Sequence, residues 1–279
     1  MSSLKNNFDI EALDIALDER SKYLRSLVVK CLLGAGRGHM GSAMSIIEIL
    51  RVCYDKYIKH YPNDPENDER DRLILSKGHG CLGLYSILAD YGYFSISELE
   101  DVGSFNSNLG GHPEHYKING VEASTGALGH GLPIAVGIAS ALKLKKNENK
   151  VIVILGDGEI NEGSIWEAAM SASKHCLDNL IVFVDYNKIQ SYGFIKEVLD
   201  LEPLSKKWES FGFYTQDING HDTSSIEKAL SLKSATQPNV IICHTVKGKG
   251  FPFAENNPKW HHKNSFTKEE IDLLREFTS

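Results

Sequence analysis

The sequence predicts an α/β protein in which a parallel β-sheet is sandwiched by helices. Three continuous apolar runs, Val151 to Leu155, Leu180 to Asp185 and Val240 to His244, are typical of strands that are buried on both faces. Helical patterns lie between these runs, and repeated strand–helix–strand order favours parallel strands covered on both sides. No repeat or low-complexity tract divides the chain, and its length allows one large domain or two small ones.

The first third of the chain is predicted to be mostly helical. Apolar residues at helical spacing predict a helix from Ile10 to Leu33, ended by Gly34. A second helix is predicted from Ala43 to Tyr57, with Ser42 as its N-cap. Residues 61–72 (YPNDPENDERDR) are polar and contain two prolines, which indicates a surface loop.

Shorter elements follow in the order that a layered sheet requires. Leu73 to Leu75 is predicted to be a short buried strand, and Leu82 to Tyr91 a helix. Residues 103–125 are rich in Gly, Asn, Ser and His, and long loops inside compact domains are usually functional. Helices are also predicted from Leu128 to Leu144 and from Lys268 to Phe277.

Composition excludes several classes of protein. The formal net charge is −7 and no basic run is present, so nucleic acid is not an expected partner. The N-terminus lacks the basic start and apolar core of a signal peptide, and the longest apolar run, Leu180 to Val184, is too short to cross a membrane. Five cysteines without a CxxC pair favour reduced thiols in a cytoplasmic protein.

The strongest chemical signal lies at the ends of two predicted strands. The run from Val151 leads into Gly156-Asp157-Gly158, and the next strand ends in Asn187. Ligands of open α/β sheets bind at the carboxyl ends of the strands, and two oxygen-bearing side chains suit Mg²⁺ or Ca²⁺. The glycines let the backbone approach an anion and offer it N–H groups, so the segment describes a diphosphate site.

A plain turn is the alternative interpretation of these residues. Short motifs such as GDG have many false positives. The buried strand before it, the helix after it and the second strand that ends in Asn187 together outweigh that alternative.

The combination of GDG with Asn187 resembles the thiamine diphosphate fingerprint, and five further segments resemble transketolases. They occur in the order of the family and cover nearly the whole chain. The resemblance implies that residues 1–279 form a single domain with the thiamine diphosphate-binding fold of the diphosphate-binding type. The segments are GHMGS at 38–42, SKGHG at 76–80, GHPE at 111–114, STGALG at 124–129 and WHH at 260–262.

The resemblance implies a metal-bound cofactor. Asp157, Asn187 and the backbone carbonyl of Ile189 match the family's ligands for Mg²⁺, Ca²⁺ or Mn²⁺, and Gly156 and Gly158 flank the diphosphate of thiamine diphosphate. The family usually has Asn-Asn at the second ligand, and this chain has Tyr186 in place of the first.

The resemblance also implies a cluster of catalytic histidines. His39, His79, His112 and a late histidine would surround the two-carbon unit of a ketose, with His79 and the late histidine also near the diphosphate. Alignment on WHG selects His261, whereas His262 is followed by Lys263 and not by a small residue. A single His beside Gly is otherwise more often a capping or packing residue.

Three more residues receive roles by resemblance. Gly126 would offer its backbone to the aminopyrimidine ring, and Leu128 would lie against the cofactor, although ordinary core packing is the alternative for Leu128. Glu162 matches an acid that meets a carboxylate of the partner subunit, and it could also favour the helix dipole. Arg37 could meet an anionic group of a sugar or pair with a surface carboxylate.

The resemblance predicts one half of a transketolase that is split over two chains. The family's pyrimidine domain, with its activating glutamate, has no counterpart in this sequence, so we expect a C-terminal transketolase subunit that carries this domain, in an α₂β₂ assembly. The substrates would be a ketose, with phosphate or sulfonate left open, and an aldose. The alternatives are the α-subunit of a 2-oxo acid dehydrogenase and a non-catalytic cofactor-binding scaffold.

Overall fold

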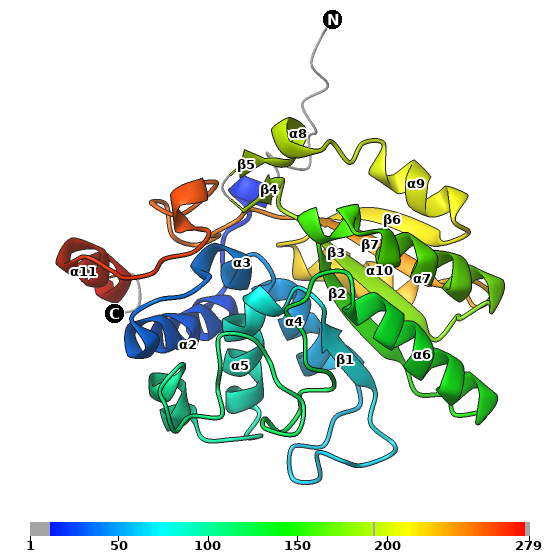
Figure 1. Ribbon diagram of the computed structural model, residues 1–279, viewed down its shortest axis with the longest axis horizontal. Coiled ribbons are helices and arrows are strands. Elements are labelled where there is room, and N and C mark those ends of the chain that lie inside the picture. The colour runs from blue at the N-terminus through cyan, green and yellow to red at the C-terminus, as the bar shows by residue number, and fades with distance from the viewer. Residues whose placement is uncertain (1–11, 192, 277–279) are drawn as a thin grey trace, which may run out of the picture.

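A five-stranded parallel sheet forms the centre of the computed structural model, which describes residues 12–191 and 193–276 (Figure 1). The strand order is β1-β2-β3-β7-β6, and every neighbouring pair is parallel. A separate antiparallel pair is formed by β4 and β5. The strands are β1 Arg72–Leu75, β2 Val151–Gly156, β3 Leu180–Tyr186, β4 Ile189–Gln190, β5 Gly193–Phe194, β6 Tyr214–Asn219 and β7 Asn239–His244.

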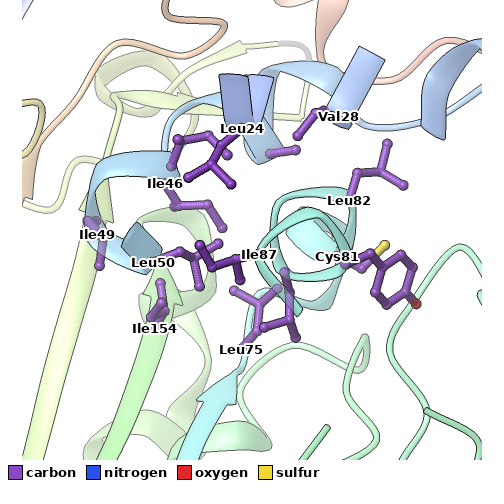
Figure 2. Close-up of a cluster of buried hydrophobic side chains, with 14 of the residues drawn as sticks. Leu24, Val28, Ile46, Ile49, Leu50, Leu75, Cys81, Leu82, Ile87 and Ile154 are labelled. Atoms are coloured by element: carbon purple, nitrogen blue, oxygen red, sulfur yellow. The ribbon is translucent and has the colours of Figure 1, made fainter. Parts of the chain in front are cut away.

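The central strands are largely apolar because each one contributes to two cores. Along β2, Ile152 and Ile154 enter the core on one face, whereas Val153 and Leu155 enter the core on the other. Figure 2 shows Ile154 in the first core, close to the side chains of helices that cover this face. This double burial explains the unbroken apolar runs and confirms the predicted sandwich.

Helices cover both faces of the sheet (Figure 1). The first layer contains α2 Glu19–Ala35, α3 Met40–Met44, α4 Ile47–Val52, α5 Cys81–Asp90 and α10 Thr223–Ser231. The second layer contains α6 Gly131–Leu144, α7 Gly163–Lys174 and α9 Leu204–Ser210. The short α8, Ile195–Val198, follows β5, and α11, Lys268–Glu276, packs against α2.

The first predicted helix is wrong at both ends. Helix α2 begins after Asp18, whose carboxylate accepts a hydrogen bond from the Ser21 N–H at 2.9 Å and so caps the helix. It continues through Gly34 and ends at Gly36, which takes the left-handed conformation with φ 65°. The first two residues of the predicted helix lie outside the described ranges.

The second predicted helix is also wrong, because it is interrupted. Helices α3 and α4 and a π-helix from Cys53 to Tyr57 replace one continuous element, and His39, not Ser42, precedes the first. At the break, the Ser42 carbonyl accepts hydrogen bonds from Lys77 Nζ at 3.1 Å and Ser45 Oγ at 3.3 Å. These tertiary contacts override the helical pattern of the sequence.

The remaining elements agree with the predictions more closely. The predicted strand at 73–75 and helix at 82–91 are β1 and α5, and residues 103–125 contain no helix or strand. Helix α6 begins three residues late because Gly129 has a φ of 80°, and Phe277 of the last predicted helix is outside the described residues. The edge strand β6 has no counterpart in the predictions, because its sequence YTQDIN is largely polar.

Two expectations about composition can be compared with the structure. In the described part of the chain, no helix combines the length and the apolar character needed to cross a bilayer. All five cysteines are free thiols, and only Cys176 is exposed.

Candidate cofactor and active site

The ends of β2 and β3 bring Asp157 and Asn187 to one edge of the sheet. Each residue directly follows its strand, and the two strands are parallel neighbours in register from Val151–Leu180 to Gly156–Asp185. Both side chains are buried and line the same cavity of about 180 Å³. The cavity lies at the carboxyl edge, where ligands of open α/β sheets bind.

Both carboxylate oxygens of Asp157 are fixed by backbone amides. Oδ1 accepts from the Gly158 N–H at 2.8 Å, and Oδ2 accepts from the Lys188 N–H at 2.7 Å. Burial raises the pKa of Asp157 to about 6, and the nearby Lys247 ammonium opposes this rise. Burial still outweighs these partners, so a cation bound at this carboxylate would stabilise its charged form.

The Asn187 amide is oriented from behind by a buried carboxylate. Its Nδ2 donates to Asp185 Oδ2 at 2.9 Å, and its Oδ1 accepts from the Ile189 N–H at 3.1 Å. Because Nδ2 is held by an acceptor, the oxygen of the amide is the atom left to face the turn after β3.

A buried ammonium already marks this cavity as a site for positive charge. Lys247 follows β7, lines the cavity and donates from Nζ to the Ile189 carbonyl at 2.7 Å. Burial lowers the pKa of Lys247 to about 8, and the charge of Asp157 opposes this change. A carboxylate, an amide oxygen and a carbonyl are the donors that Mg²⁺ and Ca²⁺ prefer, so these residues fit a divalent cation.

The described residues offer no alternative metal site made of charged or sulfur ligands. Within residues 12–191 and 193–276, no group of three His, Cys, Asp or Glu side chains could hold a metal ion. The histidines described below are therefore not grouped with acids or thiols as ligands of a transition metal.

A buried ion pair lies next to Asn187. Lys77 Nζ bonds to Asp185 Oδ2, which also accepts from Ser45 Oγ at 2.7 Å. Burial alone would raise the pKa of Asp185, but the charge and hydrogen bond of Lys77 outweigh it and lower the pKa. Lys77 also lines the cavity, so two lysines supply positive charge to one small space.

Glu159 connects three of the motif segments. Its carboxylate accepts from the Gly129 N–H at 2.9 Å, from the Gly156 N–H at 3.0 Å and from Ser76 Oγ. Burial raises the pKa of Glu159, and these three donors oppose the rise. The residue thus holds the loops at 76–80 and 124–129 against the GDG turn.

The four histidines of the predicted site come together from separate segments. The His39 ring centroid lies 5.5 Å from that of His79, 6.1 Å from that of His112 and 5.4 Å from that of His261. Burial lowers the pKa of all four histidines. The pKa falls to about 3 for His39 and His261 and well below its ordinary value for His79, and it is also lowered for His112. Neutral imidazoles can each donate and accept a proton near pH 7.

The two adjacent late histidines occupy different places. His261 lines the cavity together with Asp157, whereas His262 lies outside this cavity lining with its ring centroid 4.3 Å from that of His39. Both are half-buried. The structure therefore brings His262 to the histidine cluster as well, beside the residue that the WHG pattern selects.

The other predicted cofactor contacts divide into two groups. Gly126 and Leu128 line the cavity, and a Cβ on Gly126 would come within 2.8 Å of the His112 ring, so only glycine fits there. Glu162 is exposed and lies outside the cavity, where it precedes the first residue of α7. Arg37 is also exposed.

Lys77, Lys247, Asp185 and Glu159 were not among the predicted site residues. Lys247 follows β7 at the same sheet edge as Asp157, so the strand-end rule that selected Asp157 applies to it as well. Asp185 carries a different signal, since a carboxylate inside a strand that is buried on both faces requires a buried partner.

The chain has the thiamine diphosphate-binding fold, because its parallel sheet and helix layers match those of a solved transketolase. The chain shares that fold with a transketolase structure from Campylobacter jejuni, with a TM-score of 0.86 and 34% sequence identity. The match covers 93% of this chain but only 42% of that one.

Sequence comparison defines the family. Residues 18–278 match the model of the transketolase, thiamine diphosphate binding domain, so the chain belongs to the transketolase family. It is 44% identical to a protein of Actinobacillus succinogenes that is named as one subunit of an apulose-4-phosphate transketolase, over 88% of this chain and 90% of that protein. It is 41% identical to a protein of a Clostridium species that is named as one subunit of a 6-deoxy-6-sulfo-D-fructose transketolase, over 89% and 91%. These relatives favour a transketolase over one chain of a 2-oxo acid dehydrogenase.

Proposed function

We propose that residues 1–279 form the diphosphate-binding domain and subunit of a two-chain transketolase, which moves a two-carbon ketol unit from a ketose to an aldose. The observation that carries the proposal is the cavity at the carboxyl edge of the sheet, which Asp157 and Asn187 line together with three histidines, His39, His79 and His261. Similarity to proteins named as transketolase subunits, over 88% and 89% of this chain, supports it.

In this proposal, the cavity holds the metal and the diphosphate of thiamine diphosphate. Asp157, the Asn187 amide oxygen and the Ile189 carbonyl would bind Mg²⁺, or Ca²⁺ or Mn²⁺ in its place. The Gly158 amide region and the two buried lysines, Lys77 and Lys247, would offset the charge of the diphosphate. Gly156 also lines the cavity, where a Cβ on it would lie 3.6 Å from the Lys77 Cβ.

The histidines would bind the sugar and transfer protons. When bound, thiamine diphosphate supplies the carbanion stabilisation that allows the bond between C2 and C3 of a ketose to break. His39, His79, His112 and His261 would donate to sugar oxygens and move protons, because their lowered pKa values keep them neutral near pH 7. Gly126 and Leu128 would face the ring portion of the cofactor.

The activity would require a second chain with a pyrimidine domain, in an α₂β₂ assembly. Relatives of the same length are named as subunits, and the solved transketolase chain is more than twice as long as the part that matches. The exposed Glu162 is available to meet a carboxylate of that chain. Because the relatives are named for a phosphorylated and a sulfonated sugar, we propose an anionic ketose as donor.

Reconstitution tests this function. The chain would be co-purified with its pyrimidine-domain partner, and transfer from phosphorylated and sulfonated ketoses to aldoses would be followed with Mg²⁺ and thiamine diphosphate. We expect transfer only when both chains are present. Activity of this chain alone would overturn the two-chain proposal, and decarboxylation of 2-oxo acids without ketol transfer would favour the dehydrogenase alternative.

A further inference from the structure

The turn after β3 contains a strained residue next to the candidate metal ligands. Lys188 lies between Asn187 and Ile189 and has a φ of 69°, a left-handed conformation that non-glycine residues rarely adopt. Such conformations persist where the surroundings hold them, and they concentrate at functional sites. The contacts of Lys188 therefore show what maintains this turn.

The side chain of Lys188 contacts residues at the ends of two neighbouring strands. Its Nζ lies 3.8 Å from the centroid of the Tyr186 ring and 3.0 Å from His244 Nδ1. An ammonium can only donate, so Nδ1 of His244 accepts, and its Nε2–H is directed to Asp217 Oδ1 at 3.0 Å. Burial alone would raise the pKa of Asp217, but the bond from His244 contributes to lowering it, as expected for an ionised acceptor.

This chain of contacts crosses three strands. Asp217 lies on β6, His244 on β7 and Tyr186 on β3, and Asp217 also accepts from Ser205 Oγ on α9. His244 is buried and Asp217 is half-buried. None of Lys188, His244 and Asp217 lines the cavity, so an effect on a ligand by contact has to pass through other residues.

The backbone of Lys188 provides that connection. Its N–H donates to Asp157 Oδ2 at 2.7 Å, and its carbonyl accepts from the Ile195 N–H at 2.9 Å. The next carbonyl in the chain is that of Ile189, which Lys247 contacts at 2.7 Å inside the cavity. The conformation of Lys188 thus sets both the Asp157 carboxylate and the direction of the Ile189 carbonyl.

We propose that Lys188, held by His244 and Asp217, is a positioning residue that prearranges Asp157 and the Ile189 carbonyl for the divalent cation. The inference rests on the proposed function, because it takes these two residues as metal ligands. Residues that orient metal ligands typically change metal affinity by about 10–100-fold when they are removed.

Binding of Mg²⁺ to the two-chain assembly tests this inference without an activity assay. Titration calorimetry with saturating thiamine diphosphate would compare Lys188→Met, which keeps the aliphatic stem, with His244→Ala and with the double variant. We expect each single variant to raise the Kd for Mg²⁺ by about 10-fold or more. The double variant should bind Mg²⁺ no more weakly than the single variants, because both substitutions break the same contact between Lys188 and His244.

Two further variants separate positioning from general damage. His244→Gln can still accept from Lys188 and donate to Asp217, so it should bind Mg²⁺ more tightly than His244→Ala. Lys207→Met removes another half-buried lysine, which donates to the Leu201 carbonyl at 2.7 Å, and it should leave the Kd unchanged.

The possible failures are distinguishable. If the wild-type assembly binds neither Mg²⁺ nor thiamine diphosphate, the proposed function falls and this inference falls with it. If the wild type binds Mg²⁺ and a folded Lys188→Met variant has the same Kd, only the positioning role is overturned. If His244→Ala does not fold, Lys188→Met and His244→Gln decide the question.

Discussion

At the scale of single residues, replacing Asp157 should affect cofactor binding, whereas replacing His112 should affect turnover. Asp157 is a buried oxygen donor of the cavity, so Asp157→Ala should abolish Mg²⁺-dependent binding of thiamine diphosphate. His112 is not among the cavity-lining residues, so His112→Ala should leave cofactor binding intact and slow turnover by about 100-fold or more. Cofactor titration and kcat of the two-chain enzyme would measure both, and unchanged metal-dependent binding in Asp157→Ala would remove the metal assignment.

The buried imidazoles also predict how stability changes with pH. His39 and His261 have pKa values of about 3 in the folded chain, below the ordinary value of 6.5. Between these values the unfolded chain binds protons that the folded chain excludes, so stability is fully present above pH 6.5 and falls as the pH falls. The raised pKa of Asp157 has the opposite effect on the free energy of unfolding, because below about pH 6 the folded chain binds a proton at Asp157 more readily than the unfolded chain does.

His39→Asn should therefore lose less stability than the wild type between pH 7 and pH 5. Urea unfolding at both pH values would measure the difference, because asparagine does not titrate in this range. An equal loss in the variant and the wild type would show that His39 is not the group that acid must protonate.

Sequence alone could locate some of these site residues but not others, for physical reasons. Asp157 and Asn187 follow long apolar runs, so their position at the sheet edge is readable from the chain. Lys77 stands within SKGHG, but nothing in the local sequence indicates that it reaches Asp185 on another strand. Long-range ion pairs of this kind depend on the packing of the whole sheet, which no single segment specifies.

At the scale of elements, double burial made the central strands predictable, whereas tertiary contacts determined the helix boundaries. The break between α3 and α4 depends on Lys77, which is distant in sequence and bonds to the Ser42 carbonyl. Strand β6 was not predicted because it lies at the edge of the sheet, where a strand needs little apolar sequence. Sequence patterns therefore predict the buried central elements better than edge strands or helix ends.

The junction of α2, α4 and the loop before α10 provides a prediction at this scale. Glu48 on α4 accepts two hydrogen bonds from the buried Arg25 of α2, at 2.6 and 3.0 Å, and one contact from His221 at 2.7 Å. Glu48→Ala would leave a buried guanidinium without its counter-ion, so it should lower the free energy of unfolding by about 3–5 kcal/mol.

An exposed pair on the same layer is the matched control. Glu227 of α10 pairs with Lys56 at 2.6 Å at the surface, and Glu227→Ala should change the free energy of unfolding by less than about 1 kcal/mol. Urea denaturation would measure both variants. A loss for Glu48→Ala as small as that for Glu227→Ala would mean that the buried network does not hold the two helices together.

At the scale of the whole molecule, the cofactor and the partner chain should each tighten binding of the other. The cavity of this chain has the diphosphate side of the proposed site, and the pyrimidine domain would come from the second chain. A ligand held by both chains favours their association. Linkage requires the factor by which the partner raises cofactor affinity to equal the factor by which the cofactor raises the affinity between the two chains.

We expect that common factor to be at least about 10, within the 5–150-fold range that is typical of coupled sites. The Kd for association of the two chains would be measured by sedimentation with and without thiamine diphosphate and Mg²⁺, and the cofactor Kd by calorimetry with and without the partner. Asp157→Ala should reduce the coupling to unity, because the cofactor would no longer be anchored in this chain. If the wild-type chains associate equally well with and without the cofactor, the site is not shared between them, and the cavity at the ends of β2 and β3 would serve this chain alone.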